Sequence, residues 1–163
     1  MKFLINVIFA LIWASFQGDF SRFQIILGLV LGFFCFAIAE KIGLGVGPSY
    51  TKQLVDIVRY AVFFIAELLR ANIRVAIDVL RIKPRISPGI LAIPLEILDP
   101  WQKILLANSI TLTPGTLSID FSKDEQTLFV HFMYLDKPPE KLIAEIKLGF
   151  EARIIELKEG QSK

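Results

Sequence analysis

Two uncharged apolar stretches near the N-terminus set the strongest limit on what this chain can fold into. Residues Phe3–Gly18 and Phe23–Ala39 contain no charged side chain, and a short polar link separates them. A helix of about 16 or 17 residues, at ~1.5 Å per residue, covers roughly 25 Å, slightly less than a typical bilayer requires. Local thinning of the bilayer or contact with neighbouring protein accommodates that length. The pattern therefore predicts a short transmembrane hairpin over residues 1–41.

Charge is distributed unevenly along the chain. There are 34 charged residues (18 Lys and Arg plus 16 Asp and Glu), of which only five lie in the first 51 positions. These five are Lys2, Asp19, Arg22, Glu40 and Lys41. Because 54% of the chain is hydrophobic, above the roughly 45–50% of soluble domains, the composition excludes a disordered chain and opposes an all-soluble protein. A net charge of +2 gives no reason to expect nucleic acid as a partner.

A secretory signal peptide is the competing interpretation of the first apolar run. Lys2 would supply its basic start and Phe3–Trp13 its apolar segment. However, no small-residue cleavage site follows, and a second uncharged run comes directly afterwards. The hairpin is therefore the preferred interpretation.

Residues 42–52 form a glycine-rich connector and residues 53–85 a long amphipathic helical segment. The connector lacks the spacing and the Lys-[Ser/Thr] pair of a phosphate loop, so a flexible exit from the membrane is expected. On a wheel of 100° per residue, the charged side chains of the helix share a sector about 100° wide. This charged stripe consists of Asp56, Arg59, Glu67, Arg70, Arg74, Asp78 and Arg81.

The charged stripe is a candidate partner interface. Three pairs of opposite charge are spaced to neutralise one another: Glu67–Arg70, Arg74–Asp78 and Asp78–Arg81. Two arrangements fit a helix with so apolar an opposite face. The helix lies in the membrane interface with the stripe toward water, or it forms a third span with the stripe against a polar partner surface. The interfacial arrangement is preferred. Packing in a soluble core is less favoured, because about two thirds of this helix is apolar, more than a small domain could cover.

Positive charge indicates the orientation of the chain in the membrane. With two spans, Lys2 and the residues after Lys41 share one compartment, and the basic cluster Arg81–Arg85 marks it as the inside. The C-terminal part is therefore predicted to be cytoplasmic. With three spans, the N-terminus would start outside instead.

Residues 86–163 predict a small cytoplasmic α+β domain in the order β-α-β-β-α. The expected elements are a strand over Ile90–Ile97 interrupted by Pro94, a helix over Trp101–Asn108, a type II turn at Thr113–Thr116, strands over Thr116–Phe121 and Thr127–Tyr134, and a last helix from Pro138 to about Glu159. Leu117, Ile119 and Phe121 are expected on one strand face. The last helix would cover one face of this sheet, and the other would be left for a partner or for the hairpin. Such a domain is marginal as a free-standing core.

Signatures of catalysis are missing from the sequence. The single histidine, His131, lies in a predicted strand and has no second His or Cys with which to form a metal site. Ser109 and Ser118 lack a nucleophile elbow, and Cys35 stands inside an apolar run, which predicts burial. We therefore expect no catalytic residues, no metal and no cofactor. The apolar runs also lack ionisable side chains at bilayer depth, so the hairpin is a poor ion path.

Two stretches resemble a known family. The segment LLANSITLTPGTLSIDF at Leu105–Phe121, followed by LFVHFM, is similar to the E subunit of the Mrp (Mnh/Sha) multisubunit cation/proton antiporters. ANIRVAIDVL at Ala71–Leu80 and the N-terminal FxxxxxFAxxWA pattern also match. The specific part, Asn108–Thr116, is termed the signature segment here; its candidate residues are Asn108, Ser109, Thr111, Thr113, Pro114 and Gly115. Its local sequence predicts a helix end, a strand and a tight turn.

The resemblance implies a multi-pass protein of the bacterial plasma membrane, with the other subunits of an antiporter complex and the lipid bilayer as its partners. That complex exchanges sodium or other monovalent cations for protons. In the family, the E subunit is small and accessory, with no accepted catalytic residues, so none is carried over. The alternative is a self-sufficient membrane-anchored module whose cytosolic domain binds a ligand or regulates a partner. A membrane-anchored enzyme is a third and weaker alternative.

Overall fold

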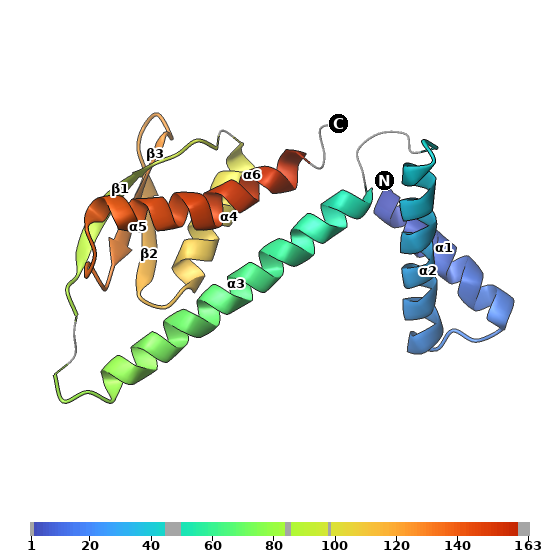
Figure 1. Ribbon diagram of the computed structural model, residues 1–163, viewed down its shortest axis with the longest axis horizontal. Helices are drawn as coiled ribbons and strands as arrows, with labels where there is room; N and C mark the ends of the chain where they lie inside the picture. Colours follow the sequence, from blue (N-terminus) through green and yellow to red (C-terminus); the bar gives the residue numbers. More distant parts are fainter. Residues whose placement is uncertain (1, 45–49, 84–85, 98, 160–163) are drawn as a thin grey trace. The chain divides into compact units, whose positions relative to one another are not determined.

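The computed structural model describes residues 2–44, 50–83, 86–97 and 99–159. It divides into two compact units, one with the residues up to Ile57 together with Glu159, and the other with Val58–Lys158. The helices and strands (Figure 1) are α1 Lys2–Gln17, α2 Arg22–Lys41, α3 Tyr50–Val79, β1 Gly89–Pro94, α4 Pro100–Leu112, β2 Thr116–Phe121, β3 Thr127–Phe132, α5 Pro139–Ile146, the π-helical turn η1 Lys147–Glu151 and α6 Ala152–Glu159. The boundary between the units falls inside α3. The division into four segments stays a prediction.

Small side chains let α1 and α2 pack closely within the first unit. Ala10 and Ala14 are buried, and Gly28 lies so near α1 that an added Cβ would stand 2.8 Å from the Cα of Ala10. The link between the helices is a tight turn with Gly18 at φ +65°, and Ser21 caps α2 by accepting a hydrogen bond from the Gln24 amide. The predicted helical pair is thus a small-residue hairpin of the kind that membrane helices use.

A polar network joins the start of α3 to this hairpin. Asn6 is 2% exposed and donates from Nδ2 to the Tyr50 hydroxyl at 3.0 Å and to the Leu29 carbonyl at 3.2 Å. The Glu40 carboxylate accepts a hydrogen bond from the Tyr50 amide at 2.7 Å and another from the Thr51 hydroxyl. The chain therefore leaves α2 and enters α3 at a defined point, which the sequence pattern does not indicate.

Most large side chains of α1 and α2 point away from the hairpin contact. Phe3, Phe16, Phe23 and Phe34 are all exposed. Cys35 is exposed too, so the prediction that it is buried is wrong: two helices cover only the narrow strip where their small residues meet. Within the described residues, α2 is long and apolar enough to cross a membrane, and α1 is a shorter apolar helix.

The second unit contains a three-stranded antiparallel sheet in the order β1-β3-β2. A bulge between Ser118 and Asp120 shifts the register of β2, so Leu117 pairs with His131 but Phe121 pairs with Leu128. The expectation that Leu117, Ile119 and Phe121 share a face is therefore wrong, because an inserted residue reverses the alternation. The expected interruption at Pro94 is the end of the edge strand β1.

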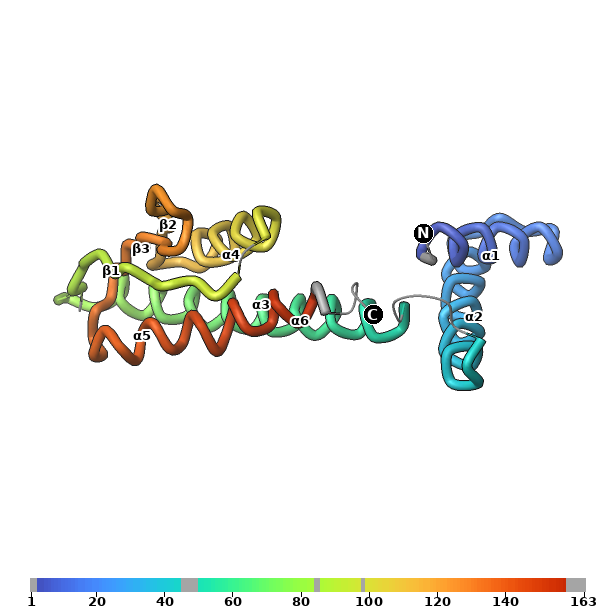
Figure 2. The backbone as a smooth tube through the Cα atoms, turned by 90° about the horizontal axis from the view of Figure 1, so that it is seen from above, coloured from blue at the N-terminus to red at the C-terminus, as the bar shows by residue number. Residues whose placement is uncertain are grey.

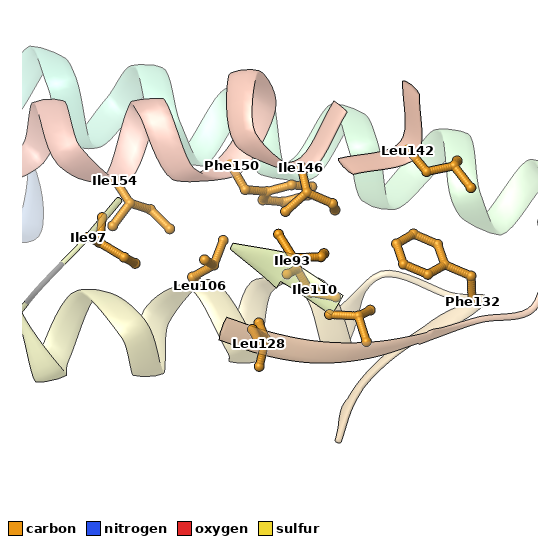
Figure 3. Close-up of a cluster of buried hydrophobic side chains, with 11 residues drawn as sticks. Ile93, Ile97, Leu106, Ile110, Leu128, Phe132, Leu142, Ile146, Phe150 and Ile154 are labelled. Atoms are coloured by element: carbon orange, nitrogen blue, oxygen red, sulfur yellow. The ribbon is translucent and has the colours of Figure 1, made fainter. Parts of the chain in front are cut away.

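One face of the sheet builds the core of this unit. Figure 2 shows the sheet and α4 on one side and α3 with α5–α6 on the other. Between these layers lies the cluster drawn in Figure 3: Ile93, Ile97, Leu106, Ile110, Leu128, Val130, Phe132, Leu142, Ile146, Phe150 and Ile154. The opposite sheet face carries Ile90, Leu117, Ile119 and Phe129, all exposed, and a half-buried His131. The helical cover over one sheet face is as expected, except that α3 contributes to it.

Two helices differ from their expected form. The helix predicted to end at Asn108 continues to Leu112, because the fully buried Ile110 packs in the core and Ser109 and Thr113 bond the carbonyls four residues back. The last helix contains the widened turn η1. Within that turn the Glu151 carboxylate, 2% exposed, accepts the amides of Glu96 and Ile97 at 2.6 and 3.1 Å, which fixes the end of the β1 segment.

Candidate interaction site

One face of α3 is fixed against the rest of the second unit. About a third of the way along α3, the Tyr60 hydroxyl lies 2.5 Å from the hydroxyl of Ser109 in α4. Further along, the Phe63 ring meets Phe150 of η1 edge to face at 5.2 Å between centroids. Arg74, more than two turns beyond Phe63, lies at 4.0 Å over the Tyr134 ring. Because the contacts extend from Tyr60 to Arg74, roughly 20 Å of helix is bound to this unit.

The charged stripe divides between this contact and solvent. Within the second unit Asp78 is buried and Glu67 is half-buried, whereas the four arginines of the stripe are exposed. Asp56 is also buried, but it belongs to the first unit. The expected pairs Glu67–Arg70 and Asp78–Arg81 form. Arg74 instead pairs with Asp136 at 2.8 Å, because the loop after β3 brings this carboxylate to it. The expectation of a partner interface on the whole stripe stays a prediction.

The opposite side of α3 is apolar and uncovered within its unit. Exposed large side chains follow one another at intervals of three or four residues, which places them on one helix face. They are Val58, Val62, Ile65, Leu69, Ile73 and Ile77, and Leu80 follows directly after the helix. The helix therefore carries the folded unit on one face and a continuous apolar surface on the other.

The signature segment connects α4, α3 and β2 through hydrogen bonds. Ser109 is buried and bonds both Tyr60 and the Leu105 carbonyl. Thr111 is exposed, and its hydroxyl accepts the Ser118 amide at 3.1 Å. Thr113 is half-buried, and its carbonyl accepts the Thr116 amide at 3.1 Å, which closes the expected turn. Asn108 is exposed, and the other members make the segment chiefly a structural joint.

Gly115 is required by this joint for two reasons. Its φ of +92° suits glycine, as the third position of a type II turn demands. In addition, a Cβ at this position would stand 3.1 Å from the Tyr134 ring. Pro114 precedes it at the position where proline favours such a turn. The motif Pro-Gly therefore lets the signature segment approach Tyr134 and, through it, Arg74 of α3.

The charged stripe and the signature segment meet at one cavity. It has a volume of about 840 Å³, and all its lining residues belong to the second unit. Glu67, Arg70 and Arg74 line it from α3. The signature segment supplies Thr113, Pro114 and Gly115 to the same cavity. The other candidate residues of the stripe and of the signature segment do not line this cavity. They are Asp56, Arg59, Asp78, Arg81, Asn108, Ser109 and Thr111.

Sequence reasoning missed the residues that complete this cavity. Lys137, Lys141 and Arg153 come from the loop before α5 and from α5–α6. Arg153 lies at 4.1 Å over the Phe63 ring and donates to the carbonyls of Leu148 and Gly149 at 3.0 and 2.8 Å. Nothing in the local sequence around these three residues indicates that they face α3. Their positive charge is the one signal that a search for clustered cations could have used.

Two ionisable groups beside the cavity have shifted pKa values. Burial raises the pKa of Tyr134, and the neighbouring carboxylate of Asp78 raises it further. Partial burial acts to raise the pKa of Asp136, but the hydrogen bond and the charge of Arg74 outweigh it and leave that pKa below its usual range. Both shifts favour a neutral Tyr134 and an ionised Asp136, which holds Arg74 in place.

No group of three or more metal-ligating side chains occurs within residues 2–44, 50–83, 86–97 and 99–159. His131 is half-buried on the outer sheet face, away from the cavity lining. The arrangement at the cavity is cationic and apolar rather than nucleophilic.

Comparison with known proteins gives a consistent result. A family model described as Na+/H+ ion antiporter subunit (MNHE) matches residues 6–157. The E subunit of the Na+/H+ antiporter of Alkalihalophilus pseudofirmus is 36% identical over 157 residues, covering 96% of this chain and 97% of that protein. The corresponding E subunit of Bacillus subtilis is 34% identical over 156 residues, with 96% and 97% covered.

A solved structure shares the fold. A chain in the membrane-bound sulfane sulfur reductase, an archaeal respiratory membrane complex, aligns with a TM-score of 0.58 at 25% identity, covering 94% of this chain and 96% of that one. The family match spans both units, including the hairpin and the signature segment. This chain therefore belongs to the family of Na+/H+ antiporter E subunits.

Proposed function

We propose that this protein is an accessory, assembly-type subunit of a multisubunit sodium/proton antiporter in the bacterial plasma membrane. The observation that carries the proposal is the apolar surface left uncovered on the hairpin and on α3, including Phe16, Phe23, Leu69 and Ile73. Exposed apolar surface on this scale marks contact with membrane or with other proteins. The names of its relatives as antiporter subunits indicate which kind of complex supplies those contacts.

The hairpin is the membrane anchor in this proposal. Residues 1–41 form two spans, and a connector leads from them to α3, which begins at Tyr50. Both helices carry large apolar side chains outward and small ones inward, the reverse of a water-soluble helical pair. With two spans, the basic cluster after α3 lies on the inner side, so residues 86–163 are cytoplasmic.

The segment of residues 53–85 lies in the membrane interface and does not cross the bilayer. A spanning helix would have to bring its bound partners into the hydrocarbon region, including the ion pair of Arg74 with Asp136. That placement is costly for charged groups. An interfacial helix instead buries only its apolar face and keeps the folded unit in water. The contacts from Tyr60 to Arg74 therefore favour the two-span arrangement over three spans.

The subunit does not itself translocate ions in this proposal. Pathways for protons or cations use ionisable groups within the membrane, and Phe3–Gly18 and Phe23–Ala39 contain none. The charged stripe lies outside the hydrocarbon region and takes part in contacts of the cytoplasmic unit. Exposed Arg59 and Arg70 remain its residues best placed to meet another subunit.

Purification from the native membrane in mild detergent, through a tag after Lys163, tests the proposal. Mass spectrometry should find several large, many-spanning subunits in the purified complex. Recovery of this chain alone as a stable species of defined size would overturn the assembly role. That result would favour the second candidate, a self-sufficient ligand-binding module, for which the cavity of about 840 Å³ is the specific support.

A further inference from the structure

Five cationic side chains surround the cavity of the second unit. They are Arg70, Arg74, Lys137, Lys141 and Arg153. Three carboxylates neutralise part of this charge through the ion pairs Arg70–Glu67, Arg74–Asp136 and Lys137–Glu145. These three carboxylates therefore leave two of the five positive charges unbalanced. Within the part of the chain that the structure describes, Lys141 and Arg153 form no ion pair with a carboxylate.

Aromatic rings restrain two of the three arginines beside the cavity. Arg74 stacks on Tyr134 at 4.0 Å and Arg153 stacks on Phe63 at 4.1 Å. Stacking restrains the planar guanidinium and leaves N–H groups at its edge available for an acceptor. Such restrained, partly satisfied arginines are typical of phosphate recognition.

The floor of the same cavity is apolar. Ile110, Phe132, Ile146 and Phe150 line it and are themselves buried in the core. Leu148, also in the lining, is 74% exposed. A free phosphate ion would satisfy the cations but leave this apolar surface in contact with water. A ligand with both an anionic group and hydrocarbon satisfies both parts of the lining.

The π-helical turn gives this cavity its shape on one side. It places Leu148 and Gly149 in the lining, and a Cβ at Gly149 would stand 3.3 Å from the Phe63 ring. The wider turn also leaves the carbonyls of Leu148 and Gly149 to accept from Arg153. Widened turns of this kind occur frequently at functional sites.

We propose that this cavity binds the headgroup and upper acyl chain of an anionic phospholipid, with the positive charges of Lys141 and Arg153 attracting the headgroup and Leu148 against the hydrocarbon. The inference goes beyond assembly and rests on the proposed interfacial position of α3, which would hold the second unit close to the level of the lipid headgroups. Anionic headgroups attract basic residues near a membrane surface. The site would hold the cytoplasmic unit on the inner leaflet independently of the other subunits.

Photo-crosslinking in native membranes tests this site. The probes are phosphatidylglycerol and phosphatidylcholine that carry a diazirine high on one acyl chain, and mass spectrometry maps the labelled peptides. We expect the phosphatidylglycerol probe to label Leu148 and its neighbours several times more than the phosphatidylcholine probe. Lys141→Glu should reduce this labelling about tenfold, since reversal of a charge near a phosphate opposes binding.

The matched control is Lys123→Glu, which makes the same charge change at an exposed residue of the β2–β3 turn, outside the cavity lining. It should leave the labelling unchanged. Equal labelling by both probes would overturn the inference, and so would equal losses in the two variants. Complete protection by millimolar inorganic phosphate would replace the lipid with a free anion. Because the complex is purified in parallel, a failed lipid site with intact co-purification contradicts this inference alone.

Discussion

The hairpin and the C-terminal unit are stabilised in opposite ways. In the hairpin the buried side chains are small, such as Ala10 and Ala14, while large ones such as Phe16 and Phe23 face outward. In the C-terminal unit the large apolar side chains are inside, and buried polar groups such as Glu151 have hydrogen-bond partners. The first unit thus suits a surrounding of hydrocarbon and the second a surrounding of water. Helix α3 has both properties, because one of its faces packs against the core of the C-terminal unit and the opposite face exposes large apolar side chains.

The largest expected effect comes from the buried carboxylate of the C-terminal unit. Glu151→Leu removes the acceptor of two backbone amides, those of Glu96 and Ile97. Because buried N–H groups without partners are costly, we expect a loss of about 3 kcal/mol in unfolding free energy. Denaturant unfolding of the full chain in detergent measures it. Glu156→Leu, at an exposed position of α6, is the control, and equal losses in the two variants would contradict the assigned role.

The corresponding change in the hairpin concerns shape and not charge. Gly28→Leu places a side chain where an added Cβ already stands 2.8 Å from the Cα of Ala10. The two helices must separate, and overpacking of this kind costs about 1–3 kcal/mol. Val30→Leu on the exposed side of the same helix should have little effect. Unfolding in a series of detergent mixtures compares them, and a stable Gly28→Leu variant would show that the close contact is not needed.

The two regions also differ in how far sequence reasoning reaches. The hairpin follows from uncharged runs, and the strand Thr116–Phe121 follows from alternation bounded by turns, so both were predictable. The end of α4 was not, because Ile110 and Thr111 favour strands locally while burial of Ile110 extends the helix. The bulge before Asp120 reversed a strand face that alternation alone had assigned.

The sequence predicted the two parts of the candidate site but not that they line the same cavity. The charged stripe was visible from helical periodicity and the signature segment from family resemblance. Nothing in either stretch shows that Glu67, Arg74 and Gly115 line one cavity. Arg74 pairs with a carboxylate 62 positions away, whereas the sequence suggested Asp78, four positions away. Partners so distant become known only when the fold is known.

A smaller effect tests the contact between α3 and the rest of its unit. Arg74→Glu places a negative charge beside Asp136 and removes the stacking on Tyr134, and Arg70→Glu places one beside Glu67. Because both ion pairs are partly exposed, we expect each variant to lose roughly 1 kcal/mol of unfolding free energy. The amount of assembled complex in native gels should fall in both variants and remain normal in Lys158→Glu. Equal amounts of complex in all three variants would mean that the charged stripe has no role in assembly.

The smallest expected effect is a response to acid. The pKa of Asp136 lies below its usual range, because Arg74 outweighs the effect of partial burial. A carboxyl group with a lowered pKa in the folded state stabilises that state above its unfolded pKa of about 4. This stabilisation disappears as the pH falls through the folded value. The melting temperature of the wild-type chain should therefore decline below about pH 4 slightly more steeply than that of Asp136→Asn. Parallel declines in the two proteins would mean that the pair with Arg74 contributes nothing measurable, and that packing contacts such as those of Tyr60 and Phe63 hold α3 to its unit.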